Sequence, residues 1–284
     1  MRRAAALILA CAACACATPD SRSPSMEDAR SLAAAETAFA AQSVREDMRA
    51  AFIANFARDG VLVRNGWTNA REYFSPRPAP PIVLDWRPAY TEVASSGELG
   101  LSTGPWKLTS KADAAAPAAY GQFVSVWKRD PGGTWRVLVD LGISHPGPVL
   151  WDRPLETVAV SAEAADVGDT IEAAERRFAD DARVNGPRAA YAAHGSSSLR
   201  LYRDGASPMT DKASALAWPG LADERRAWTI EKSEAARSGD FGYARGVYAL
   251  NGAAKPDGWY LRVWHREAGA WRIALDVSNP APRN

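Results

Sequence analysis

Two glutamates, Glu36 and Glu175, are the first residues in the chain whose type and position suggest chemistry. Each lies four residues after the first apolar residue of a helical stripe and three residues before a phenylalanine. This spacing predicts that both carboxylates lie on the inward face of their helices. Burial would raise the pKa of such a carboxylate toward the range of a general base. The alternative is a structural carboxylate, hydrogen-bonded to a nearby Tyr, Trp or Arg.

Two aspartates, Asp140 and Asp276, end the last predicted strand of each half of the chain. Strict alternation puts the apolar residues of these strands on one face, and the aspartates with Arg136 or Arg272 on the other. Because the apolar set is expected to face the interior, we expect the charged set on the outer face of the sheet, where it could meet a second sheet. A twofold arrangement there would bring Arg136 near Asp276 and Arg272 near Asp140. We favour this interface role over the alternative, a catalytic one, and a β-bulge near the strand end would reverse the assignment.

Aromatic residues at strand positions are candidates for the lining of a ligand cavity. The chain has 11 Trp, and most of them fall at repeated positions. The predicted pocket residues, all aromatic apart from one arginine, are Trp86, Tyr90, Trp127, Trp228, Tyr248, Arg262 and Trp264. Such a lining would suit an apolar or aromatic ligand. The alternative is that these rings are ordinary core residues.

Other kinds of chemistry find little support in the composition. The histidines, His145, His194 and His265, form no pair at the spacing of metal ligands, so we expect no metal site and no cofactor. After Cys16 the chain has no thiol for a disulfide or a nucleophile. The formal net charge is +1, both signs are interspersed, and no basic run indicates a nucleic-acid partner.

A repeated segment shows which elements position these residues. Residues 123–140, FVSVWKRDPGGTWRVLVD, return as YLRVWHREAGAWRIALD at 260–276. Each copy predicts two strands joined by a tight turn that contains glycine. Glu36 and Glu175 fall at matching places before these segments, and the other matching positions follow in the same order at nearly the same separation. Preserved order with changes only in the connections indicates a duplicated domain.

Each copy begins with helical periodicity, passes through a short strand and ends in long strands of period two. This order is typical of an α+β fold. A chain of 284 residues is long enough for two such domains. We therefore expect a signal peptide over 1–16, a linker over 17–27, a first domain over 28–150, a linker over 151–168 and a second domain over 169–284.

The N-terminal residues have the pattern of an export signal. Arg2 and Arg3 precede an uncharged run over 4–17, which is long enough for a signal-peptide core and too short to span a bilayer. Cysteines preceded by small residues resemble a bacterial lipoprotein signal, which implies that Cys16 is lipidated, with Cys14 as second candidate. An ordinary cleaved signal is the alternative. We expect a periplasmic protein that is attached to a membrane through this lipid only.

Together, the element order, the repeated hairpin and the Ser-Gly-Glu/Asp-x-Gly strand starts at 96–100 and 238–242 resemble the SnoaL-like, nuclear transport factor 2-like superfamily. The resemblance implies two tandem cones, each a curved, mostly antiparallel sheet wrapped around N-terminal helices with a pocket at the open end. It also implies that the two outer sheet faces meet, as an internal pseudo-dimer. Enzymes of the superfamily use an Asp or His base opposite Tyr or acid donors, and no such set maps onto this chain.

Two functional hypotheses follow. The preferred one is a non-catalytic module of the cell envelope that binds a small apolar ligand or another envelope protein. The alternative is an isomerase, dehydratase or hydrolase of small hydrophobic substrates, with Glu36 or Glu175 as the base.

Overall fold

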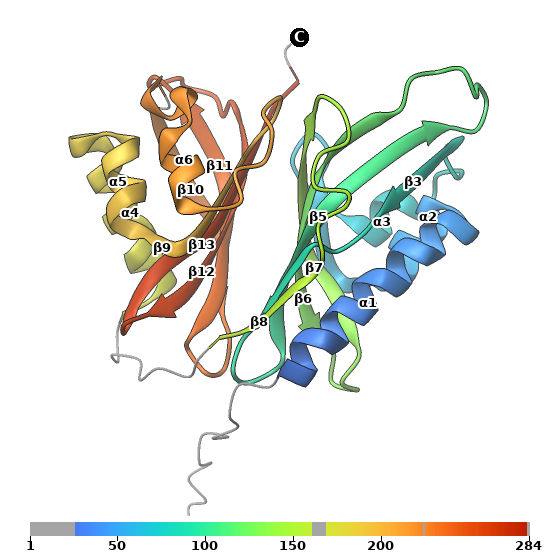
Figure 1. Ribbon diagram of the computed structural model, residues 1–284, viewed down its shortest axis with the longest axis horizontal. Coiled ribbons are helices and arrows are strands. Elements are labelled where there is room, and N and C mark those ends of the chain that lie inside the picture. The colour runs from blue at the N-terminus through green and yellow to red at the C-terminus, as the bar shows by residue number, and fades with distance from the viewer. Residues whose placement is uncertain (1–25, 161–168, 224, 283–284) are drawn as a thin grey trace, which may run out of the picture.

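A computed structural model describes residues 26–160, 169–223 and 225–282. The predicted signal peptide and Cys16 lie outside these residues. The described chain forms two halves, each a curved sheet that carries its helices on one face, and the sheets turn their other faces toward each other (Figure 1). This arrangement confirms the predicted α+β class. No helix in the described ranges is both long and apolar enough to cross a membrane.

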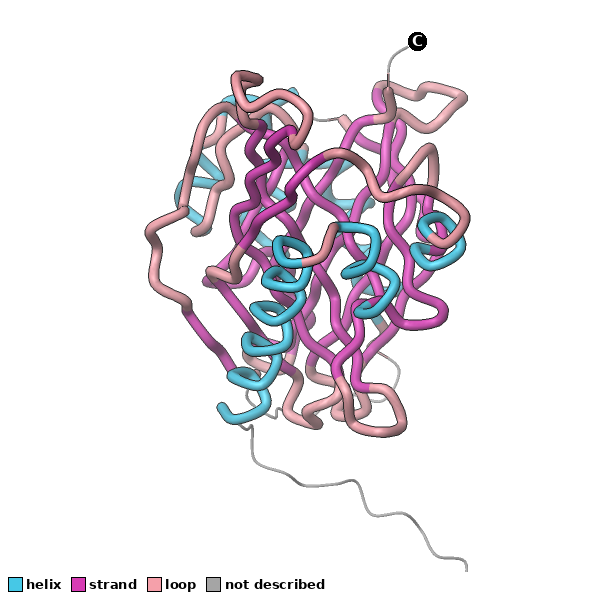
Figure 2. Tube along the Cα trace, turned by 90° about the vertical axis from the view of Figure 1, so that its right-hand side faces the viewer, coloured by secondary structure: helices cyan, strands magenta, loops and turns pink. Residues whose placement is uncertain are grey.

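The first half contains three helices and eight strands. Its elements are α1 (Met26–Arg45), α2 (Met48–Asn55), β1 (Phe56–Val63), β2 (Trp67–Asn69), α3 (Ala70–Phe74), β3 (Ile82–Trp86), β4 (Tyr90–Val93), β5 (Leu99–Ser110), β6 (Ala119–Arg129), β7 (Trp135–His145) and β8 (Glu156–Ala159). The strand order is β2-β1-β7-β6-β5-β4-β8, and β3 also pairs with β5. Figure 2 shows α1 and α2 lying across this sheet.

The second half repeats this plan with fewer strands. Its elements are α4 (Ile171–Asn185), α5 (Pro187–His194), β9 (Gly195–Arg203), α6 (Lys212–Ala217), the 3-10 helix η1 (Pro219–Asp223), β10 (Arg226–Ala235), β11 (Phe241–Leu250), β12 (Gly258–Glu267) and β13 (Ala270–Pro280). The strand order is β10-β11-β12-β13-β9. In both halves the first strand pairs in parallel with the last long strand, and the β5–β6 and β11–β12 pairings are antiparallel.

Local sequence signals explain several element ends. Asp47 caps α2 by accepting a hydrogen bond from the Ala50 amide at 2.7 Å, and Thr170 caps α4 in the same way. The β12–β13 turn places Ala268 and Gly269 at positive φ of 53° and 76°, the backbone that a two-residue hairpin turn requires.

Three apolar clusters form the core. One fills the space between the helices and the sheet of the first half, and a second does so in the second half. The third lies between the two sheets and includes Leu101, Val126 and Leu141 from the first and Leu261 and Leu275 from the second. The two halves therefore share a buried apolar layer.

The predicted linker over 151–168 differs from expectation at its start. Residues 156–159 form β8, which pairs in parallel with β4 at the edge of the first sheet. Part of this segment is thus a strand of the first half rather than a free connection, and residues 161–168 lie outside the described ranges.

A β-bulge interrupts β7 at Leu138. Val126 pairs with Val139 and Trp127 pairs with Val137, so Leu138 is an extra residue in the ladder. A bulge turns the residues that follow it to the opposite face. The apolar residues before the bulge therefore pack below the helices, whereas those after it pack between the sheets.

The same irregularity occurs in β13. Val263 pairs with Leu275 and Trp264 pairs with Ile273, which leaves Ala274 as the extra residue. Both last strands therefore present the residue two positions beyond the bulge to the helix side. That residue is an aspartate in each half.

Candidate ligand pocket of the first half

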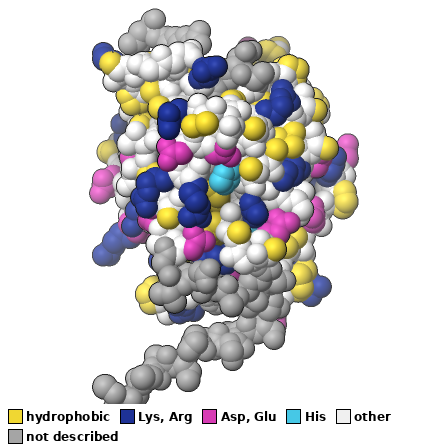
Figure 3. All heavy atoms as spheres, turned by 90° about the vertical axis from the view of Figure 1, so that its left-hand side faces the viewer, with side chains coloured by type: hydrophobic (Ala, Val, Ile, Leu, Met, Phe, Trp, Pro, Cys, Tyr) yellow, Lys and Arg dark blue, Asp and Glu magenta, His cyan; other side chains and the backbone are white. Residues whose placement is uncertain are grey.

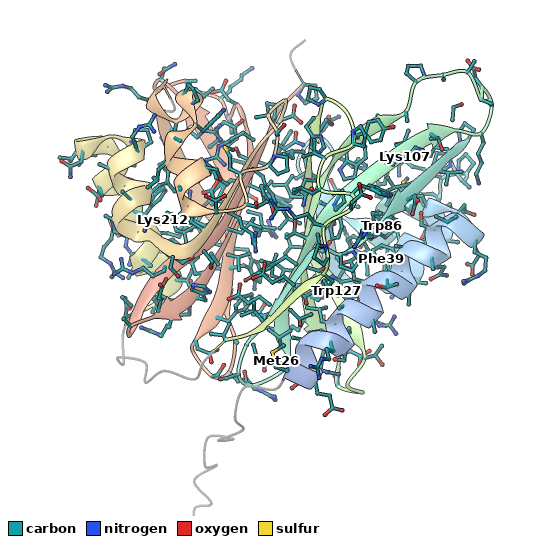
Figure 4. All side chains as sticks on the ribbon, viewed as in Figure 1. Met26, Phe39, Trp86, Lys107, Trp127 and Lys212 are labelled. Carbon is teal, nitrogen blue, oxygen red and sulfur yellow. The ribbon has the colours of Figure 1, made fainter. Side chains whose placement is uncertain are left out.

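A cavity of 490 Å³ lies between the helices and the sheet of the first half. Its walls are largely apolar and include Phe39, Leu84, Trp86, Trp106 and Phe123. Figure 4 shows Phe39, Trp86 and Trp127 together between α1 and the strands. Ligand cavities in proteins commonly measure about 300 to 1,000 Å³ and carry a few polar groups on an apolar lining.

The second half contributes to the rim of this cavity. Trp259 and Asn279 line it, and the Asn279 side-chain amide donates a hydrogen bond to the Gly142 carbonyl at 2.6 Å. The site of the first half is therefore completed by residues at the start of β12 and the end of β13.

Glu36 lies at the wall of the cavity and is fully buried. Its Oε1 accepts a hydrogen bond from Trp86 Nε1 at 2.7 Å, and its Oε2 accepts one from Trp127 Nε1 at 2.8 Å. Burial raises the pKa of Glu36 to about 7, although the two indole hydrogen bonds oppose the rise. Both protonation states are therefore accessible near neutral pH.

Asp140 faces the same cavity, which corrects the prediction that it lies on the outer face. The bulge at Leu138 turns it to the helix side, where its Oδ2 accepts a hydrogen bond from Ser125 Oγ at 2.7 Å. Burial raises its pKa to about 6, against the Ser125 hydrogen bond and the positive charge of Arg64. The negative charge of Asp140 in turn helps to raise the pKa of Glu36.

The corresponding carboxylates of the second half are bridged by an arginine. Arg262 Nη1 donates to Glu175 Oε2 at 2.6 Å, and Arg262 Nε donates to Asp276 Oδ2 at 2.6 Å. Arg203 adds a second cation to Asp276 at 2.8 Å. Burial acts to raise the pKa of Asp276, but these two cations bring it down to about 2. Asp276 is therefore ionised, whereas burial raises the pKa of Glu175 against the positive charge of Arg262.

The predicted contacts between the halves through Arg136 and Arg272 are wrong. Arg136 donates to the Ala54 carbonyl at 2.7 Å and Arg272 donates to the Ala193 carbonyl at 2.5 Å, each within its own half. The aspartates expected as their partners face inward in both halves because of the bulges.

Other residues connect the two sheets. The hydroxyls of Ser96 and Ser238 lie 2.8 Å apart, and Ser95 Oγ donates to Asp240 Oδ2. His265 Nδ1 lies 2.5 Å from Glu92 Oε1, which is almost fully buried.

The predicted pocket residues fall into different places. In the first half Trp86 lines the cavity, Trp127 lies behind it as a donor to Glu36, and Tyr90 faces the layer between the sheets. The prediction for Tyr90 is therefore wrong. Trp86 pairs with Trp106 and Tyr90 pairs with Thr103, so four residues on this side face three on β5. This irregularity moves Tyr90 to the opposite face.

In the second half the predicted aromatic residues pack around Arg262 and Arg226. Trp264 Nε1 donates to Glu175 at 2.7 Å, and Trp228 packs against the ring of Phe178. The Tyr248 ring lies 4.1 Å from the guanidinium carbon of Arg226. Arg262 is the counterpart of the cavity-lining Ser125, and its side chain is completely buried against Phe178 and Trp228.

Ser125 and Arg203 were missed among the candidate residues. Ser125 matches Arg262 at the same separation that relates Trp127 to Trp264. Matching the two halves of the sequence position by position would therefore have shown a serine in one half where the other has an arginine.

Within the described ranges, no group of three or more His, Cys, Asp or Glu is arranged to hold a metal ion. On the side of the molecule formed by α4 and α5, acidic and basic side chains alternate and do not gather by sign (Figure 3).

Comparisons with known proteins gave structural similarity only. No protein-family model matches the chain, and no curated protein matches it. An NTF-2-like protein of unknown function from Shewanella oneidensis MR-1 is 17% identical, over 38% of this chain and 98% of that one, with a TM-score of 0.32. A ketosteroid isomerase-like protein from Erwinia carotovora atroseptica is 19% identical, over 43% and 98%, with a TM-score of 0.34. A protein of unknown function with a cystatin-like fold from Nostoc punctiforme is 16% identical, over 41% and 91%, with a TM-score of 0.32.

Proposed function

We propose that the chain is a tandem of two nuclear transport factor 2-like domains whose first domain binds a small, largely apolar ligand without changing it chemically. The observation that carries the proposal is the difference between the two interiors. The first holds a cavity of 490 Å³ beside Glu36 and Asp140, whereas Arg262 fills the matching place in the second.

In this proposal the second domain supports the first. It shares the apolar layer between the sheets and supplies Trp259 and Asn279 to the rim of the cavity. We further propose that the protein is exported and anchored through a lipid on Cys16. The support is the sequence pattern at the N-terminus, where Arg2 and Arg3 precede an uncharged run that contains this cysteine.

A displacement experiment with matched variants tests ligand binding. N-phenyl-1-naphthylamine, a neutral probe that fluoresces in apolar sites, is titrated into the protein. Leu108 lines the cavity and is half-buried, while its neighbour Lys107 does not line it. Leu108→Trp should fill the cavity and lower the affinity for the probe by about tenfold or more, because the larger side chain occupies the space that the probe needs.

Lys107→Trp is the control, because it adds the same bulk on the same strand outside the cavity. Its affinity for the probe should equal that of the unchanged protein. An equal loss of affinity for the probe in both variants would refute a ligand site in this cavity. So would the absence of saturable probe binding by the unchanged protein.

A second candidate function is proton-transfer catalysis on a hydrophobic carbonyl compound. It is favoured by the pKa of Glu36, raised to about 7 at the wall of the cavity, which suits a base that works near neutral pH. Deuterium uptake next to the carbonyl of a cyclic ketone, followed by NMR, would detect it. Loss of uptake in Glu36→Gln with unchanged ketone binding would establish the base, and absence of uptake in the unchanged protein would exclude this reaction.

A further inference from the structure

The two halves place the same kinds of residue around one position. The matched pairs are Glu36 and Glu175, Phe39 and Phe178, Trp86 and Trp228, and Asp140 and Asp276, which follow one another in the same order along both copies. They occupy matching elements, since α1 and α4 precede their sheets and β7 and β13 carry the same bulge. Three matched positions differ at the centre. Ser125 in the first half corresponds to Arg262 in the second, and Phe52 and Phe123 correspond to Tyr191 and Tyr260, whose hydroxyls donate to Asp276 and Glu175.

In the second half this position holds an organic cation that belongs to the chain itself. The Arg262 guanidinium carbon lies 4.2 Å from the centre of the Phe178 ring and 5.1 Å from that of Trp228. The same group pairs with Glu175 and Asp276, and the residue is completely buried. Two carboxyl groups and two aromatic faces together are a suitable environment for a desolvated cation.

The first half retains the two carboxyl groups and the two aromatic rings, without the cation and without the tyrosine hydroxyls. Within the described ranges neither Glu36 nor Asp140 takes part in an ion pair, and the hydrogen-bond partner found for Asp140 is the neutral Ser125. The indole of Trp86 occupies one oxygen of Glu36 and that of Trp127 the other, so Asp140 is the carboxyl group more open to a ligand.

Arg64, the counterpart of Arg203, does not replace the missing cation. Arg203 pairs with Asp276 at 2.8 Å. Arg64 instead donates to the Val63 carbonyl, and its guanidinium lies over the Tyr73 ring at 5.2 Å. It lines the cavity and exerts a positive potential on Asp140, but makes no ion pair with it.

We propose that the ligand of the first half is an organic cation: an amine, amidinium or guanidinium group on an apolar body, paired with Asp140 and placed against the Phe39 and Trp86 rings. This inference rests on the proposed function, because it names the chemical class of the ligand in the same cavity. The apolar body would lie along Leu84, Trp106 and Phe123. The Arg262 side chain of the second half is the internal example of such a ligand.

The proposal predicts a pH dependence of binding. The titratable groups that line the cavity are Glu36 from α1, Asp140 from β7 and Arg64 after β1. A bound cation favours the ionised carboxylates, whose pKa values are raised to about 7 and about 6 in the empty protein. Affinity should therefore increase from pH 5 to pH 8, and binding should release protons.

The test compares probes of similar shape and different charge. Phenethylamine and benzamidine are the cations, 2-phenylethanol and benzamide the neutral analogues, and phenylacetate the anion. Each displaces N-phenyl-1-naphthylamine from the full chain at pH 8. We expect the cations to bind about tenfold more tightly than the neutral probes, as a charge in a desolvated carboxylate site requires.

Two isosteric variants locate the charge. Asp140→Asn should abolish the preference for cations while neutral probes still bind. Asp85→Asn is the matched control, because Asp85 lies between two lining residues of β3 and does not itself line the cavity. Its preference for cations should be unchanged.

The outcomes separate the two proposals. If neutral and cationic probes bind equally, or Asp140→Asn keeps the preference for cations, the cavity is a ligand site but its ligand is not a cation. If the dye itself shows no saturable binding, the proposed ligand-binding function fails as well.

Discussion

Replacing Glu36 by glutamine tests whether this carboxyl group is held in a neutral form by its surroundings. Glu36 is fully buried, and its two oxygens accept hydrogen bonds from Trp86 and Trp127. Burial raises its pKa from 4.5 to about 7. The folded protein therefore binds this proton more tightly than the unfolded chain does, and ionisation of Glu36 destabilises the fold.

The size of the effect follows from the pKa. A rise from 4.5 to about 7 corresponds to about 3 kcal/mol, present as stability below pH 4.5 and lost as the pH rises to 7 and above. Glutamine does not titrate, but its amide can accept from only one of the two indoles. The lost hydrogen bond costs about 1 to 3 kcal/mol at every pH.

The assay is urea denaturation of both proteins at several pH values from 5 to 8. Glu36→Gln should be the less stable protein at pH 5. Its stability relative to the unchanged protein should improve by about 2 to 3 kcal/mol by pH 8, because only the unchanged protein ionises this side chain. A stability difference that is constant between pH 5 and pH 8 would refute the raised pKa and the acid–base role drawn from it.

The remaining predictions concern the second half, the contact between the sheets and the N-terminus. Arg262→Met should destabilise the protein by about 3 to 5 kcal/mol in thermal or urea unfolding, because it removes the buried cation that bridges Glu175 and Asp276. Arg136→Met, at a partly exposed site, should cost about 1 kcal/mol or less. Burial acts to raise the pKa of Glu92, but the His265 imidazole leaves it below its ordinary value. The ionised form of Glu92 therefore stabilises the fold above pH 4.5, and this contribution is lost on acidification. Glu92→Gln should accordingly lower the free energy of unfolding at pH 7 and have a smaller effect at pH 4. Cys16→Ser should abolish incorporation of labelled fatty acid in a bacterial host, and unchanged labelling would exclude lipidation at this residue.

Helix spacing and sequence periodicity predicted the fold class and part of the site. The i, i+4 position of Glu36 and Glu175 relative to the leading apolar residues places both carboxyl groups inside, where the structure has them. The alternating strands and glycine turns predicted the hairpins of β6–β7 and β12–β13. These signals are local, so a single sequence is sufficient to find them.

Which face of the sheet each residue of the last strands occupies could not be predicted, because an alternating pattern gives no sign of an extra residue. Leu138 and Ala274 are ordinary strand residues, and nothing in their type indicates a bulge. The irregularity before Tyr90 did leave a signal. A Cβ at Gly104 would lie 1.9 Å from the Arg87 carbonyl oxygen, and one at Gly246 would lie 1.9 Å from that of Thr229. A glycine inside a strand often marks such a place.

The presence of both sheets in a single polypeptide has a consequence for how the molecule can vary. In an assembly of two identical subunits, a mutation that plugs one interior plugs both. Here arginine at 262 and serine at 125 are specified by separate codons, so one interior can be sealed for rigidity while the other stays accessible. The difference between the two halves is therefore encoded in the sequence itself, and a substitution in one half leaves the other unchanged.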